Sequence, residues 1–245
     1  MRISALSKQT LARHYTAFDP RQDFRNINLV RLIISLVSGQ TVLDIGSGSG
    51  FLLNELNKEG KKAFGVEPLK EMLTISRKRY PELSIYQGYA EDIEKIFPHV
   101  VDAVIMTDVL EHIENDKEQL KKISRKIKKG GQIIIVVPAY QFLYGKRDEQ
   151  LGHYRRYSSR ILKKNLEESG FRVANIRYWN TLGIFPYFFS EKILGKPLNS
   201  SLRTSAKAGI AKKALRRALS LWFRNIENKI NFGFGLSIIC VGQKK

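Results

Sequence analysis

Short, mostly apolar runs alternate with amphipathic segments through the first 138 residues of the chain. The runs are rich in aliphatic and aromatic side chains, as expected for strands that helices cover on both faces. These predicted strands are residues 41–43, 62–67, 83–86, 101–107 and 132–137. The segments between them have helical periodicity and stop at glycine or proline. These predicted helices are residues 49–58, 69–79 and 116–127. The alternation predicts an α/β fold with a parallel sheet.

The pattern is less regular outside this region. Residues 5–38 read as helical cover, and residues 139–158 predict an irregular loop after Pro138. The remaining predicted elements are a helix at 159–169 and strands at 171–178 and 236–241. An insertion at about residues 181–234 separates the last two strands.

The insertion contains an apolar run at 182–189 and a segment of clean helical period at 211–226. The apolar face of that predicted helix consists of Leu215, Ala218, Leu219, Trp222, Phe223 and Ile226. Lysines and arginines fall largely on its other faces, which is typical of a helix that lies in a membrane interface. The alternative is a lid that packs on the domain over a pocket. The two arrangements are compatible if a substrate enters from the membrane.

The charge of the chain is strongly positive and unevenly distributed. The 245 residues carry a net charge of +19, and residues 139–245 hold 21 lysines and arginines against six acids. Such a field concentrates anionic partners, although basic runs also occur on ordinary solvated surfaces. The length suits one α/β domain with a full core. Cys240 is the single cysteine, which excludes an internal disulfide.

A glycine-rich turn follows the first predicted strand. Residues 44–50 read Asp-Ile-Gly-Ser-Gly-Ser-Gly, and glycines allow a ligand to approach the backbone closely. A dinucleotide fingerprint would place its last glycine at residue 51, which is Phe51. Asp44 would also repel a phosphate. The turn therefore favours a cationic or zwitterionic ligand.

Further acids follow the next strands. Glu67 ends the second strand, where an acid can accept hydrogen bonds from ribose hydroxyls. Glu91 and Asp92 follow the third strand, where a carboxylate can accept from an exocyclic amine such as that of adenine. Thr107 ends the fourth strand. These side chains are expected to meet at the carboxyl edge of the sheet.

Four signatures together resemble a class I S-adenosylmethionine-dependent methyltransferase of the small-molecule type: the glycine turn, Glu67, Ala90-Glu91-Asp92 and Val109-Leu110-Glu111-His112. The resemblance implies a Rossmann-like sheet of seven strands, mostly parallel with the last strand antiparallel, and helices on both faces. It divides the single domain into helical cover at 1–38, a cofactor-binding half at 39–138 and a substrate-binding half at 139–245. The residues that it assigns to the cofactor are Asp44, Gly46, Ser47, Gly48, Gly50, Glu67, Pro68, Ala90, Glu91 or Asp92, and Thr107.

The predicted loop at 139–158 holds the string Gly-His-Tyr-Arg-Arg-Tyr at residues 152–157, which resembles a bacterial and archaeal subgroup of these enzymes. We expect His153 to be the general base for a hydroxyl acceptor. Arg155 and Arg156 can hold a carboxylate or phosphate, since arginine offers bidentate geometry. The side chains expected to line the acceptor pocket are Tyr140, Tyr154 and Tyr157.

His112 is the rival base, because it lies just past the fourth strand. With Asp108 and Glu111 it forms a D-x-x-E-H string, and ubiquinone-type O-methyltransferases can hold a divalent cation on a similar E-x-x-E-H string. The alternative is that Glu111 and His112 cap the next helix and shape the pocket. We expect no metal.

Together, the cofactor signatures, the arginines of the loop and the basic insertion predict an enzyme that methylates an anionic or lipid-linked small molecule or a glycan precursor, and the histidine base favours methylation on oxygen. The alternatives are an RNA methyltransferase, N-methylation of a small metabolite, or a binding protein that has lost activity. The start of the chain has no long apolar stretch, and no run approaches the roughly twenty apolar residues of a membrane span. We therefore expect a cytoplasmic protein that can contact the inner face of the membrane through residues 181–226.

Overall fold

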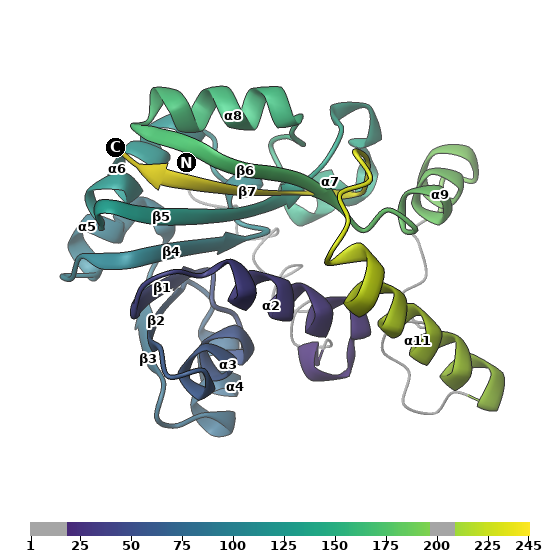
Figure 1. Ribbon diagram of the computed structural model, residues 1–245, viewed down its shortest axis with the longest axis horizontal. Helices are drawn as coiled ribbons and strands as arrows, with labels where there is room; N and C mark the ends of the chain where they lie inside the picture. Colours follow the sequence, from purple (N-terminus) through teal and green to yellow (C-terminus); the bar gives the residue numbers. More distant parts are fainter. Residues whose placement is uncertain (1–18, 197–208) are drawn as a thin grey trace.

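The computed structural model describes residues 19–196 and 209–245, which form one seven-stranded sheet with helices on both faces (Figure 1). The strand order is β3-β2-β1-β4-β5-β7-β6, and β7 runs antiparallel to both of its neighbours. The strands are β1 (Thr41–Ile45), β2 (Lys62–Glu67), β3 (Ser84–Gln87), β4 (Val101–Thr107), β5 (Ile127–Pro138), β6 (Phe171–Trp179) and β7 (Ser237–Lys244). The predicted mostly parallel sheet with an antiparallel last strand is confirmed.

Alternate side chains of the central strands belong to two separate hydrophobic clusters. In β4, Val104 and Met106 belong to one cluster, whereas Ala103 and Ile105 belong to the other. This is the two-residue period that a strand imposes when both of its faces are covered. The clusters hold the sheet between two helical layers.

One layer consists of α2 (Phe24–Leu36) and α3 (Phe51–Lys58), and the other of α5 (Ile93–Ile96), α6 (Asp116–Arg125) and α8 (Ser159–Glu168). The other helical segments up to residue 168 are η1 (Pro20–Gln22), α4 (Lys70–Arg79), η2 (Ala90–Asp92), η3 (Leu110–His112), η4 (Gln141–Leu143) and α7 (Lys146–Leu151). The part of the predicted N-terminal cover at residues 5–18 lies outside the described residues.

Two sequence-based boundaries were wrong. The predicted helix 116–127 ends at Arg125, and β5 begins at Ile127, five residues before its predicted start, because Ile127 pairs with Val101 at the beginning of β4. The segment 139–158 is also less irregular than predicted, since it contains η4 and α7. Gly152, with a φ of 75°, ends α7.

The described parts of the insertion are helical at 184–193 and 210–227. They comprise α9 (Ile184–Tyr187), the π-helical η5 (Phe188–Ile193), α11 (Ile210–Trp222) and the π-helical η6 (Phe223–Glu227). The Phe223 ring lies 5.9 Å from Phe24 and 5.0 Å from Trp179, which fastens the end of α11 to the domain. Residues 197–208 lie outside the described part. Among the described residues, no helix has the length and apolar character needed to cross a membrane.

Candidate functional site

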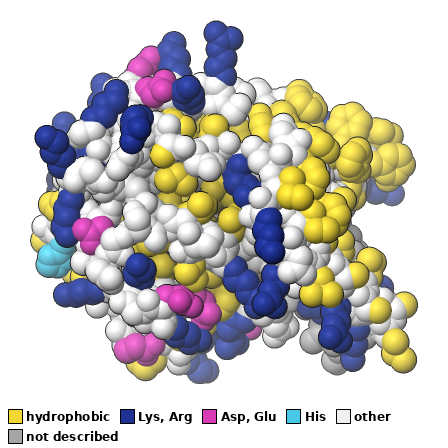
Figure 2. All heavy atoms as spheres, in the orientation of Figure 1, with side chains coloured by type: hydrophobic (Ala, Val, Ile, Leu, Met, Phe, Trp, Pro, Cys, Tyr) yellow, Lys and Arg dark blue, Asp and Glu magenta, His cyan; other side chains and the backbone are white. Residues whose placement is uncertain are grey.

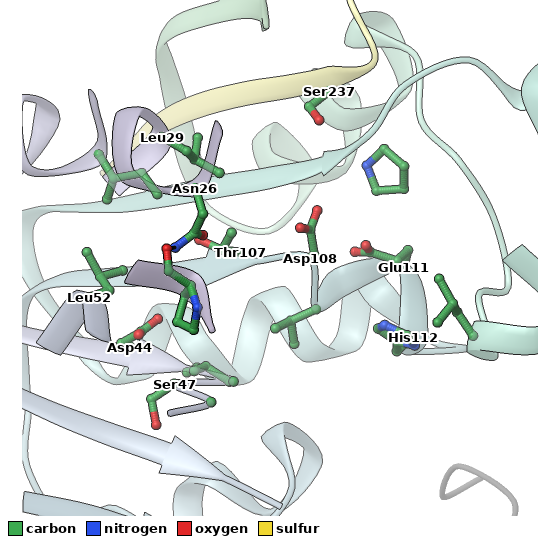
Figure 3. Close-up of a pocket in the computed structure, with 18 of the residues that line it drawn as sticks. Asn26, Leu29, Asp44, Ser47, Leu52, Thr107, Asp108, Glu111, His112 and Ser237 are labelled. Atoms are coloured by element: carbon green, nitrogen blue, oxygen red, sulfur yellow. Dashed lines mark hydrogen bonds between the residues drawn. The ribbon is translucent and has the colours of Figure 1, made fainter. Parts of the chain in front are cut away.

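A cavity of about 640 Å³ opens at the carboxyl ends of β1, β2 and β4, where parallel α/β sheets bind ligands (Figure 3). Its wall combines the glycine turn, the loops after β2 and β4, and the segment around α7. Residues from α2, the α9 region and α11 complete it. A cavity of this volume accommodates a cofactor-sized ligand.

The glycine turn requires glycine for steric reasons. Gly46 and Gly48 have φ values of 78° and 53°, in the left-handed region that disfavours other residues. A Cβ atom on Gly46 would lie 2.4 Å from Val109 Cγ2. The backbone N–H of Gly48 donates to Glu67 Oε2 at 2.8 Å, so the turn and the end of β2 form one rigid unit.

Asp44 and Glu67 are both buried in this wall. Burial raises the pKa of Glu67 to about 7, although its carboxylate accepts hydrogen bonds from the backbone of Leu69 and Gly48. Burial, and then the nearby Glu67, raises the pKa of Asp44 well above its usual value. A bound cation or a set of hydroxyl donors would relieve this cost, because it would stabilise the charged carboxylates.

The structure separates the predicted cofactor residues into two groups. Those that line the cavity are Asp44, Gly46, Ser47, Gly48, Glu67, Pro68, Ala90, Glu91 and Thr107. Gly50 and Asp92 do not line it. Gly50 instead begins α3, where a Cβ atom would lie 2.5 Å from Ser76 Oγ, so this glycine permits close packing between α3 and α4. Of the two candidates after β3, Glu91 is therefore the one placed at the site.

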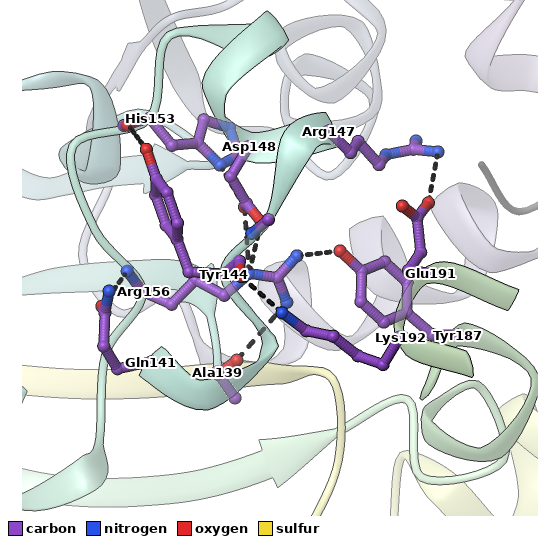
Figure 4. A network of polar contacts seen from close by, with 11 residues as sticks. Ala139, Gln141, Tyr144, Arg147, Asp148, His153, Arg156, Tyr187, Glu191 and Lys192 are labelled. Carbon is purple, nitrogen blue, oxygen red and sulfur yellow. Dashed lines mark hydrogen bonds and ion pairs between the residues drawn. The ribbon is translucent and has the colours of Figure 1, made fainter. Parts of the chain in front are cut away.

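His153 lies in the cavity wall and is oriented by Asp148 from α7. His153 Nδ1 lies 2.8 Å from Asp148 Oδ1 (Figure 4). Arg156 Nε donates to both oxygens of the same carboxylate, at 2.9 and 3.0 Å. Burial alone would raise the pKa of Asp148, but the bonds from His153 and Arg156 outweigh it and lower the pKa. Asp148 is thus an anion that fixes the imidazole in one orientation.

His112 contacts His153 edge to face, with ring centroids 4.6 Å apart. Burial, and then the neighbouring His153, lowers the pKa of His112 to about 3, so this ring is neutral at physiological pH. Glu111 is fully buried with both carboxyl oxygens unpartnered, and burial followed by the charge of Asp108 raises its pKa well above the usual value.

Ligand atoms of Glu111, His112 and His153 lie within 4.8 Å of one another, a spacing that suits a metal ion. The sequence pattern had grouped Glu111 and His112 with Asp108; in the structure, His153 joins them in this cluster. All four residues line the cavity.

Most of the residues predicted to bind the acceptor point elsewhere. Tyr157 is fully buried, and its hydroxyl donates to Asp116 at 2.8 Å. Tyr140 stacks on Tyr178 with ring centroids 5.3 Å apart. Neither tyrosine lines the cavity, because packing and a buried hydrogen bond draw them into the domain.

The two arginines of the string also differ from expectation. Arg155 donates to the Glu114 carbonyl oxygen at 2.6 Å and, like the partly exposed Tyr154, does not line the cavity. Arg156 lines it, but its guanidinium is already paired with Asp148 and donates to the Tyr187 hydroxyl. Both guanidinium groups therefore already have partners within the protein, and of the two only Arg156 lies in the cavity wall.

Sequence reasoning missed several residues of the wall. Asn26 enters from α2, Arg147 from α7, Tyr187 from α9, and Leu219 from α11. The apolar face of α11 did contain Leu219 and Phe223, but nothing local in the sequence showed that this face would meet the cavity. Because α11 packs on the domain and contributes Leu219 to the cavity wall, its position is compatible with the lid that the sequence offered as one alternative. This position is also compatible with contact between α11 and a membrane.

Comparisons with known proteins agree with this geometry. The family described as "methyltransferase domain" matches residues 10–176. An uncharacterised methyltransferase from Bacillus mycoides is 31% identical over 155 residues, which cover 56% of this chain and 71% of that protein.

Solved structures share the fold at low sequence identity. The chain is similar to a SAM-dependent methyltransferase from Archaeoglobus fulgidus, with a TM-score of 0.60 and 22% identity, over 91% of this chain and 96% of the other. A second similar structure, an S-adenosylmethionine-dependent methyltransferase from Mesorhizobium loti, has a TM-score of 0.59 and 12% identity, over 88% of this chain and 96% of the other.

Proposed function

This chain belongs to the methyltransferase-domain family and is an S-adenosylmethionine-dependent enzyme; from that premise, we propose that it methylates a hydroxyl oxygen of an anionic, lipid-linked small molecule or glycan precursor. The observation that carries the oxygen assignment is the Asp148–His153 pair in the cavity wall, 2.8 Å apart. A buried carboxylate on one imidazole nitrogen leaves the other nitrogen free to accept a proton.

The residues present fit the cofactor. Glu67 would accept from the ribose hydroxyls, Asp44 would lie near the cationic amino end, and Glu91 would accept from the adenine amine. Gly46 and Gly48 leave room for the methionine part against the backbone. S-adenosylmethionine supplies a methyl group on a positively charged sulfur that is already an activated leaving group.

The protein's own contribution is alignment, exclusion of water and removal of one proton. His153 would take the proton of the acceptor hydroxyl as the oxygen attacks the methyl carbon. Asp148 would stabilise the resulting imidazolium, and His112 would remain neutral beside it. Because the leaving group is already activated by its positive charge, the protein has to act mainly on the acceptor hydroxyl.

The composition of the cavity supports an acceptor with a large apolar part. Leu29, Leu182, Leu219 and Phe223 are apolar residues that line it. Arg156 is neutralised by Asp148, so an anionic group of the acceptor fits better at the mouth, near the basic surface of the second half of the chain. We place the enzyme at the cytoplasmic face of the membrane and in the Gly-His-x-Arg-Arg-Tyr subgroup.

The test is transfer of a radiolabelled methyl group from S-adenosylmethionine to extracted lipids, lipid-linked glycans and RNA. We expect label in the lipid fraction, and its loss with His153→Ala. His99→Ala is the matched control, because His99 packs on Phe64 and Phe97 away from the cavity. Label in RNA, or in an amine, would overturn the acceptor assignment. Full turnover by His153→Ala would overturn the base.

A further inference from the structure

An exposed apolar patch covers the outer surface of α9 and η5. Phe185 is 66% exposed and Phe189 is 54% exposed, and the patch continues through Phe188, Ile193 and Leu194. Figure 2 shows these apolar side chains gathered at one end of the molecule. Large exposed patches of this kind mark contacts with an apolar partner or phase.

A second groove, which is basic, lies where α11 meets η1 and α2. Its lining includes Arg21, Lys213, Arg216 and Arg217. Arg21 pairs with Asp19, and Arg216 donates to the Gln22 carbonyl oxygen, whereas Lys213 and Arg217 are exposed. Four cations from two elements thus converge on one groove, and such a field attracts anionic headgroups.

The acids nearest to this surface are turned inward. Between Glu191 and Glu227 the sequence has no acid at all. Glu227 is fully buried and accepts from the backbone and hydroxyl of Thr181, at 3.0 and 2.9 Å. Glu191 is largely buried and faces Arg147 at 4.0 Å. The described acid beside the basic groove is Asp19, which is paired with Arg21 at 2.8 Å and with Arg79 at 3.4 Å. The outer surface is therefore mainly apolar and cationic.

We propose that the apolar patch and the basic groove together dock the enzyme on an anionic phospholipid bilayer. The aromatic side chains of α9 and η5 enter the interface, and the cations of α11 and η1 contact the headgroups. Both segments project from the same end of the molecule, beyond the carboxyl edge of the sheet (Figure 1). Exposed aromatic side chains and cations at one end of a molecule are the features that bind an anionic membrane surface.

The α9 region and the α11–η6 segment also contribute residues to the wall of the cavity. Leu182, Pro186 and Tyr187 line it from the α9 region, Leu219 lines it from α11, and Phe223 lines it from the start of η6. Docking would place the mouth of the cavity against the bilayer. This step rests on the proposed function: a lipid-borne acceptor would reach His153 without passing through water.

The experiment is flotation of the full-length protein with vesicles of phosphatidylcholine alone or mixed with phosphatidylglycerol, over a series of salt concentrations. We expect salt-sensitive binding to the anionic vesicles only, because headgroup attraction is screened by ions. Lys213→Glu with Arg217→Glu should weaken this binding roughly tenfold or more. Phe185→Ser with Phe189→Ser should abolish the part of the vesicle binding that remains at high salt, because that part comes from apolar contacts with the bilayer.

Matched controls lie on α8, on the opposite layer of the sheet. Ile161→Ser removes an apolar side chain of similar exposure, and Lys163→Glu with Lys164→Glu reverses two exposed charges. Thermal unfolding checks that every variant is folded. Equal loss of binding in the α8 variants and the α9 or α11 variants would overturn the proposal, as would the absence of vesicle binding by the wild type. Competition by an oligonucleotide that removes all vesicle binding would assign the basic groove to nucleic acid instead.

Failure of the docking proposal is distinguishable from failure of the proposed function. His153→Ala should float with anionic vesicles as the wild type does. The surface variants should keep methyl transfer to a detergent-dispersed acceptor. Methyl transfer without vesicle binding would overturn docking alone, and vesicle binding without methyl transfer to oxygen would overturn the function alone.

Discussion

The backbone N–H of Tyr154 donates a hydrogen bond to the Glu111 carbonyl oxygen, at 2.8 Å. This bond joins the loop after α7 to the loop after β4, which are more than 40 residues apart in the sequence. It brings the two candidate bases, His112 and His153, into contact. The two histidines therefore have different roles in one site: His112 is held neutral by burial, and His153 is held by an anionic carboxylate.

Asp148→Asn tests the positioning role of that carboxylate. We expect kcat to fall between about 10²- and 10⁴-fold with little change in KM, because the asparagine can orient the ring wrongly and does not stabilise an imidazolium. Removing the anion also leaves Arg156 unpaired in a buried position, which costs about 3–5 kcal/mol of folding stability. Kinetics should therefore be measured well below the midpoint of unfolding. A folded variant with unchanged kcat would contradict the role.

Glu67→Gln tests the cofactor side of the site through its pH dependence. The pKa of Glu67 in the free enzyme is raised to about 7, so its carboxyl group is largely protonated below that pH. Ribose hydroxyls donate best to the ionised form. Affinity for S-adenosylmethionine should therefore fall as the pH drops below about 7, by up to about tenfold per pH unit.

The same raised pKa lowers the stability of the free enzyme as the pH rises from 4.5 to about 7, because the folded state holds a proton that the unfolded state releases. Glu67→Gln should flatten both the binding profile and this stability profile. Calorimetric titration and thermal unfolding across this range measure them. Glu59→Gln, an exposed change at the end of α3, is the control. A wild-type affinity that is independent of pH would refute the assignment.

Gly46→Ala tests whether the turn needs glycine for space or only for conformation. The new Cβ atom would lie 2.4 Å from Val109 Cγ2, which is a steric clash. The positive φ of this residue would add backbone strain, because alanine disfavours that conformation. We expect a loss of about 2–5 kcal/mol in unfolding free energy, together with loss of cofactor binding. Gly60→Ala has nearly the same φ and no atom within 4 Å, so it should cost only about 1–2 kcal/mol. Equal losses in denaturant melts would show that packing against Val109 is unimportant.

The features that local sequence determines were the ones that could be predicted. The strand that ends in Asp44, the following turn and the acid at Glu67 each depend on a few adjacent residues, and their meeting follows from parallel strands sharing one carboxyl edge. Gly50 lies outside the cavity wall, which its sequence could not show, because a glycine with a positive φ suits both the approach of a ligand and the close packing of α3.

For the acceptor side of the site, the sequence predicted the position of the loop but not the directions of its side chains. The string at 152–157 correctly indicated a loop beside the site, but the direction of each side chain depends on partners far away in the sequence, such as Asp116 for Tyr157. Asp148 was missed because it precedes the string within α7, a helix that the irregular pattern did not predict. The contact of α11 with the cavity likewise depends on tertiary packing.

Tyr157→Phe separates a folding role from a substrate role for the last tyrosine of the string. The Tyr157 hydroxyl donates to Asp116 at 2.8 Å in the core, and burial followed by that carboxylate raises the pKa of the phenol. Its removal leaves a buried carboxylate with one donor fewer, so we expect a loss of about 1–3 kcal/mol in unfolding free energy. The KM for the acceptor should not change, because Tyr157 does not line the cavity.

The control is Tyr154→Phe, on a partly exposed ring, which should alter the free energy of unfolding by less than about 0.5 kcal/mol. A raised KM with unchanged stability in Tyr157→Phe would instead return this residue to the acceptor site.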